Sequence, residues 1–140
     1  MSNLDIKQNI FSDELKKHIF QSLGEHAVRK IGINGVAEEP ISFEMRDEGV
    51  FVGCVVVQMF WGQLHIKLLI VEEGHRNKGY AKKLMEHAFK YGKERGCSFA
   101  FVETLSFQAP DFYQKLGFEV EFKRDGYDRD TSFYYLRRDL

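Results

Sequence analysis

The hydrophobic pattern of residues 41–71 constrains the fold most, because it predicts β-strands, and not helices, over about thirty consecutive residues. Residues 41–46 alternate apolar and polar side chains, residues 50–60 form a β-branched and aromatic run, and residues 63–71 are apolar again. Short breaks that contain glycine separate the three segments, as is typical of antiparallel hairpins. The stretch therefore predicts a three-stranded antiparallel meander.

The spacing of apolar residues changes after a polar loop at residues 72–78. A helical stripe follows and ends at Gly96, a residue that favours helix termination. The stripe consists of Ala81, Leu84, Met85 and Ala88. Residues 98–104 are then a short apolar strand. A strand, a helix and a second strand predict a parallel crossover, so the sheet is expected to be mixed.

The C-terminal third continues the alternation of helix and strand. Pro110 occupies a favoured first helical position, and Gly117 closes the short helix that it begins. Residues 118–123 and 131–136 are expected to form strands that pair as an antiparallel hairpin around a polar turn. The predicted fold class is α/β (α+β), with a mixed, mostly antiparallel central sheet flanked by helices.

The N-terminal region predicts one amphipathic helix. Ser12 is a suitable cap, apolar residues recur every fourth position, and Gly24 is the expected end of the helix. The apolar positions are Leu15, Ile19 and Leu23. Residues 25–40 mix apolar residues with glycines and charges, which leaves a short helix or a substrate-side loop as alternatives.

Length and composition limit the function classes. A chain of 140 residues fits one domain, so we expect residues 1–140 to form a single domain. A net charge of -1 gives no overall attraction to nucleic acid or anionic lipid. We read neither a secretory signal nor a membrane span, and we expect a cytoplasmic protein. Cys54 and Cys97 have no metal-ligand spacing, so no metal is expected.

The loop before the best-defined helix has the composition of a phosphate-binding site. Gly79 allows the chain to turn so that amide groups converge at a helix N-terminus, while Arg76 and Lys78 add positive charge. The nucleoside-triphosphate loop is excluded, because Tyr80 and Ala81 stand where that loop has Lys and Ser/Thr. The Gly-x-Gly-x-x-Gly fingerprint of dinucleotide-binding proteins is also missing.

Two segments resemble motifs of the GNAT family of N-acetyltransferases. The sequence Arg76-Asn77-Lys78-Gly79-Tyr80-Ala81 matches the family signature Arg/Gln-x-x-Gly-x-Gly/Ala in full. Residues 112–118 are similar to the family's Tyr-x-Lys-x-Gly-Phe segment and stand at the family's distance from the first motif. The resemblance covers residues 43–118, whereas the first 40 residues carry no family motif.

This resemblance implies a fold and a cosubstrate. The strand ending at Val71 and the strand of residues 98–104 would splay apart, with acetyl-CoA between them. The pantetheine arm would bond backbone groups of residues 69–71, and the pyrophosphate would lie on amides between Arg76 and Lys82. The implied cosubstrate contacts are Leu69, Ile70, Val71, Arg76, Asn77, Lys78, Gly79, Tyr80, Ala81 and Lys82. Where many family members have a CoA-contacting asparagine, this chain offers Ser106 or Gln108.

Tyr113 is the first candidate for a catalytic residue. It matches the family tyrosine that faces the CoA sulfur, where a phenol can protonate or hydrogen-bond the leaving thiolate. Without the motif, a tyrosine packed on an apolar helix face would be the better interpretation.

His65 and Glu103 are the candidates for the base. His65 lies eleven residues before Arg76, where several family members place a catalytic glutamate or histidine. Its unperturbed pKa of about 6.5 suits deprotonation of an ammonium near neutrality. Glu103, at the end of the second splayed strand, is the alternative base or a ligand of the cationic amine. His75 is a weaker candidate that would touch CoA or solvent.

The predicted function is acetyl-CoA-dependent N-acetylation of a small-molecule amine, such as a polyamine, an amino sugar or an antibiotic. Peptide termini remain an alternative acceptor. A non-catalytic acyl-CoA-binding module is the rival from another class, and a nucleic-acid-binding domain ranks last because the chain has no basic stripe. A homodimer is expected at the level of the family only.

Overall fold

The computed structural model describes residues 3–35 and 38–140. The chain divides into two compact units, residues 1–36 and residues 37–140. The expectation of one functional domain over the whole chain stays a prediction. None of the described helices is long and apolar enough to cross a membrane.

The N-terminal unit contains helix α1 (Asp13–Ile31), which begins where the sequence predicts. The Leu15 amide donates to Oγ of Ser12 at 3.1 Å. The helix continues through Gly24 and ends at Ile31, with Gly32 as its C-cap, so its predicted end was wrong. A Cβ at position 24 would lie 2.9 Å from the Asn34 side chain, which explains a glycine at this point without a helix end. The predicted apolar stripe of α1 is exposed.

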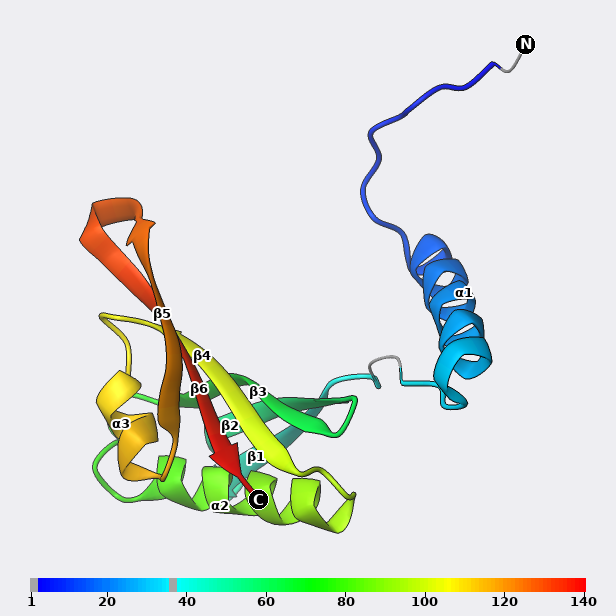
Figure 1. Cartoon of the computed structure of the whole chain (residues 1–140). Helices are drawn as coiled ribbons and strands as arrows, with labels where there is room; N and C mark the ends of the chain where they lie inside the picture. Colours follow the sequence, from blue (N-terminus) through cyan, green and yellow to red (C-terminus); the bar gives the residue numbers. More distant parts are fainter. Residues whose placement is uncertain (1–2, 36–37) are drawn as a thin grey trace. The chain divides into compact units, whose positions relative to one another are not determined.

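The second unit contains a six-stranded sheet in the order β1-β2-β3-β4-β6-β5 (Figure 1). The strands are β1 (Ile41–Asp47), β2 (Val50–Phe60), β3 (Gln63–Val71), β4 (Phe99–Leu105), β5 (Glu119–Tyr127) and β6 (Thr131–Asp139), with the 3-10 turn η1 (Asp128–Asp130) before β6. Every neighbouring pair is antiparallel except β3 and β4, which are parallel. The predicted mixed, mostly antiparallel sheet is confirmed.

Two tight turns build the predicted meander. Glu48-Gly49 and Trp61-Gly62 all have positive φ, from 48° to 83°. Positive φ at both central residues is the geometry of the turns that suit the twist of two-residue hairpins, and glycine adopts it without strain. Trp61 therefore serves as a turn residue.

Two helices complete this unit. Helix α2 (Tyr80–Glu94) contacts β1, β2 and β3, and buries the predicted stripe at Leu84, Met85 and Ala88. Figure 1 shows α2 along one face of the sheet, with the short helix α3 (Pro110–Lys115) near the β5–β6 hairpin. Residues from β2, β3, β4 and β6 form the core together with α2 and Tyr113. This packing fixes the start of α2 against the end of β3.

A substitution at Gly53 tests how closely β2 packs against the end of β3. A Cβ added there would lie 2.7 Å from the Ile70 carbonyl oxygen and 3.3 Å from Cα of Val71, and neither backbone atom can rotate away. We expect Gly53→Ala to lower the free energy of unfolding by about 1–3 kcal/mol, because this overpacking outweighs the smaller gain from a stiffer unfolded chain. Urea denaturation, monitored by circular dichroism, measures this change in the free energy of unfolding.

The exposed Ser42→Ala on β1 is the control for that experiment, since it changes a neighbouring strand without a new contact. An unchanged urea midpoint for Gly53→Ala would show that β2 and β3 have room to move apart.

Candidate active site

The site begins where the parallel strands separate. β3 and β4 pair only from Gln63 with Phe99 to Ile66 with Val102. The register of β3 with β2 shifts directly after this point, so Lys67 is a bulged residue. Bulges bend a strand and often stand beside active sites. Beyond the bulge, residues 68–71 remain bonded to β2, while their other edge has no neighbouring strand.

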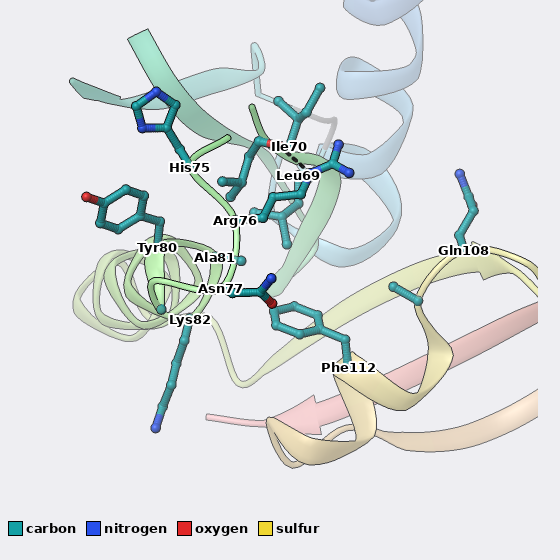
Figure 2. Close-up of a pocket in the computed structure, with 13 residues that line it drawn as sticks. Leu69, Ile70, His75, Arg76, Asn77, Tyr80, Ala81, Lys82, Gln108 and Phe112 are labelled. Atoms are coloured by element: carbon teal, nitrogen blue, oxygen red, sulfur yellow. Dashed lines mark hydrogen bonds between the residues drawn. The ribbon is translucent and has the colours of Figure 1, made fainter. Parts of the chain in front are cut away.

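A cleft of about 610 Å³ opens at this edge. Figure 2 shows its lining side chains on the end of β3, on the following loop and the start of α2, and on the segment that leads into α3. The lining includes all the predicted acetyl-CoA contacts except Lys78 and Ser106. It also includes His75, Gln108, Ala109 and Phe112.

The start of α2 leaves its amide groups available. Gly79 has a φ of 78° at the N-cap and offers no side-chain cap, and the first turn of α2 contains no acidic residue. The first helical amide that donates to a carbonyl at this end is that of Lys83, to Gly79 at 3.1 Å. The amides before it have no partner within the helix, and the helix dipole adds partial positive charge. The cleft therefore meets an anion-binding helix end.

Basic side chains surround the same point. Nε of Arg76 donates to the Val71 carbonyl at 3.1 Å, which ties the loop to the end of β3. Within the described part of the chain, no carboxylate forms an ion pair with Arg76, Lys78 or Lys82. Their charges remain available to an anionic ligand, although Lys78 itself does not line the cleft.

Gln108, and not Ser106, borders the cleft. Oγ of Ser106 accepts from the Ser132 amide at 3.1 Å, so this hydroxyl joins β4 to β6. Oε1 of Gln108 accepts from the Leu105 amide at 3.0 Å and from the Thr104 hydroxyl at 3.3 Å. The amide oxygen of Gln108 is thereby occupied, which leaves its NH₂ group as a donor toward a ligand.

Tyr113 lies in the core and does not line the cleft, although its neighbour Phe112 does. Tyr113 is 7% exposed, and its ring packs edge-on against Phe112 and Phe118. Its hydroxyl has no hydrogen-bond partner, yet the only buried side-chain nitrogen or oxygen without a partner in residues 3–35 and 38–140 is Nδ1 of His75. The phenol oxygen must therefore reach the surface. Burial raises the pKa of Tyr113, which keeps the phenol protonated near neutrality.

His65 and Glu103 lie in direct contact. Nε2 of His65 and Oε1 of Glu103 are 3.2 Å apart, and the side chains are 19% and 36% exposed. Burial lowers the pKa of His65, the charge of Glu103 opposes that shift, and Lys67 adds to it. The two candidates for the base therefore form one pair.

Three of the lining residues were not assigned to the cosubstrate. The sequence predicts that His75 touches either CoA or solvent; in the structure it lines the cleft, and its Nδ1 atom is buried without a hydrogen-bond partner. Ala109 is the N-cap of α3 and Phe112 directly precedes Tyr113, so their closeness to the motif tyrosine in sequence was the one signal that could have found them. In the described ranges, no group of three or more His, Cys, Asp or Glu side chains could hold a metal ion.

Comparisons with known proteins agree on one family. A model described as the acetyltransferase (GNAT) family matches residues 8–118. A blasticidin-S acetyltransferase of Streptomyces morookaense is 33% identical over 95 residues, which cover 67% of this chain and 70% of that protein.

Solved structures share the fold. An acetyltransferase from Bacillus cereus ATCC 14579 matches with a TM-score of 0.78 at 24% identity, over 96% of this chain and 98% of that chain. A streptothricin acetyltransferase candidate from Bacillus anthracis, solved in complex with acetyl coenzyme A, matches with a TM-score of 0.68 at 20% identity, over 74% and 64% of the two chains. At these identities the likeness supports the fold alone.

Proposed function

Because this chain belongs to the acetyltransferase (GNAT) family, we propose that it transfers the acetyl group of acetyl-CoA to a primary amine of a small molecule. The observation that carries the proposal is the cleft along the free edge of β3, beyond the point where β3 and β4 separate, which ends at the uncapped N-terminus of α2. A ligand there would meet a free strand edge at one end and an anion-binding helix end at the other. Pantetheine and pyrophosphate, joined in one molecule, have this combination of groups.

The free edge of β3 suits the pantetheine arm. Residues 69–71 are bonded to β2 on one side only, so their outward backbone groups can pair with the amides of an extended ligand as a strand would. Gln108 stands across the cleft with its NH₂ group free to donate, and takes the place of the family asparagine.

The loop and the start of α2 suit the pyrophosphate. Amides between Arg76 and Lys82 can donate to its oxygens, and the helix dipole and the unpaired cations stabilise its charge. Anchoring the cosubstrate in this way would hold the thioester near the point where β3 and β4 separate.

The chemistry follows from the protonation states of the site. His65 accepts one proton from the acceptor ammonium, and the neutral amine then attacks the thioester carbon. A C–N bond forms, the C–S bond breaks, and Tyr113 gives its proton to the departing thiolate. The phenolate recovers a proton from the amide nitrogen, while His65 releases its own to solvent. The products are the acetylated amine, CoA and one proton.

A small-molecule acceptor is favoured over a peptide because a relative that is 33% identical is named as acetylating blasticidin S. An amine panel tests this choice and includes aminated antibiotics, polyamines, amino sugars and peptides with free N-termini. Mass spectrometry of each mixture with acetyl-CoA is expected to find one added acetyl group on a small amine. Acetylation of peptides alone would redirect the proposal to peptide termini, and no acetylation despite CoA binding would favour the acyl-CoA-binding module.

A further inference from the structure

We propose that Glu103 is a positioning residue: its carboxylate holds the His65 ring in the tautomer with the proton on Nε2, so that Nδ1 is the atom that accepts the substrate proton. The inference rests on the proposed function for the role of His65 as base, but the arrangement itself can be tested without a substrate.

The strand register creates the contact. His65 stands opposite Phe101 in the parallel pair of β3 and β4, and Glu103 follows two residues later on the same face of β4. The last paired residues are Ile66 and Val102, so the His65–Glu103 pair straddles the point where the strands separate. A side chain held at this point lies at the inner end of the opening between β3 and β4.

The chemistry of the two groups determines the tautomer. An ionised carboxylate only accepts hydrogen bonds, so its 3.2 Å contact with Nε2 requires that Nε2 carries a proton. In the neutral ring the lone pair is then on Nδ1. This atom has no hydrogen-bond partner, and it is not among the buried unpaired atoms of the described residues, so it is open to solvent. The exposed nitrogen is therefore the basic one.

Among the residues that the structure describes, Glu103 is the one carboxylate in contact with His65. On β3, Lys67 donates to Oε1 of Gln58 on β2 at 3.0 Å. On β6, Tyr135 stands opposite Glu103 and accepts from Arg124 at 3.2 Å. The Phe101 ring lies 5.2 Å from the imidazole and contributes no charge.

These neighbours decide how the pair responds to protonation. Burial and Lys67 lower the pKa of His65, whereas the charge of Glu103 and its hydrogen bond raise it. When Nδ1 takes the substrate proton, the imidazolium formed lies against a carboxylate. Glu103 thus strengthens the base and also orients it. Neutralising Glu103 must shift the pKa of His65 further down.

Nitrogen-15 NMR of the histidine rings in the full chain tests the arrangement directly. The wild-type His65 ring, assigned by its loss in His65→Gln, is expected as the Nε2–H tautomer at neutral pH. Glu103→Gln is expected to lower the pKa of His65 by about one unit, as for loss of a close opposite charge, and to give a mixture of tautomers. Glu86→Gln removes an exposed carboxylate on α2 and is the matched control; it should change neither the pKa nor the tautomer of His65. A wild-type ring with the proton on Nδ1, or an unchanged ring in Glu103→Gln, overturns the proposal.

Steady-state kinetics with an amine that the protein is found to acetylate supply the second readout. The acidic limb of kcat/KM is expected to move to lower pH in Glu103→Gln by the same amount as the NMR pKa, and the plateau to fall about tenfold because the base is weaker and less well oriented. If Glu103→Gln abolishes the limb while His65→Gln retains it, Glu103 is itself the base and the proposal is wrong. If no amine is acetylated, the proposed function fails, but the NMR result still decides how Glu103 acts on His65.

Discussion

Gly79→Asp is expected to raise the Kd of acetyl-CoA by about 100-fold. Gly79 is the N-cap of α2, and a Cβ at this position would meet no atom within 4 Å, so a new side chain would extend into open space where we propose that the pyrophosphate binds. A carboxylate about 4 Å from a pyrophosphate oxygen costs up to about 4 kcal/mol near a protein surface, and each 1.4 kcal/mol is tenfold in Kd. Loss of a favourable anion site adds to that repulsion.

Gly79→Asn is the matched control, because it has the same size and the same backbone strain without the charge. The φ of 78° disfavours any side chain here, and Asn and Asp tolerate it better than most residues. Isothermal titration calorimetry with acetyl-CoA measures both variants. Equal affinities for Gly79→Asp and Gly79→Asn would mean that no phosphate binds at the start of α2.

Tyr113→Phe is expected to lower kcat by about 10- to 1,000-fold and to leave the Kd of acetyl-CoA unchanged. Burial raises the pKa of Tyr113, so the phenol stays protonated, and its oxygen reaches the surface, where its proton can pass to a leaving thiolate. Phenylalanine keeps the ring contacts with Phe112 and Phe118 and removes only the hydroxyl. The effect should therefore fall on the chemical step.

Tyr91→Phe on α2 is the matched control. It also removes one tyrosine hydroxyl, but the ring of Tyr91 packs against Phe43 and has no proposed role in catalysis. Steady-state kinetics on an amine from the panel, together with thermal denaturation, separates catalysis from stability. Full activity in Tyr113→Phe would show that Tyr113 is a packing residue. Its position in the core would suggest that role if the motif were absent.

The fold was predictable where local pattern determines it. The meander follows from two-residue periodicity, and α2 follows from its apolar stripe, since both are properties of short segments. The end of α1 was not predictable, because Gly24 is explained by the approach of Asn34 and not by a helix end. The place of β6 between β4 and β5 also depends on pairing between segments distant in sequence.

The site divides in the same way. The loop and the strand edge could be predicted as a site because the motif and the strand before it are contiguous in sequence, and nearly all of the predicted contact residues line one cleft. That Gln108 and not Ser106 borders the cleft was not predictable, because it goes with two hydrogen bonds that hold the Gln108 oxygen and one that uses the Ser106 hydroxyl. The contact of His65 with Glu103 depended on the register of parallel strands joined by a long crossover, which no local pattern fixes.

The central claim is that acetyl-CoA binds along the free edge of β3 with its pyrophosphate at the start of α2. Titration of nitrogen-15-labelled protein with acetyl-CoA, followed through the backbone amide signals, measures this directly. The account predicts that the largest shifts belong to residues 69–71 and 76–82, the segments that border the cleft. Saturable shifts confined to other parts of the chain, or no shifts at millimolar acetyl-CoA, would contradict it.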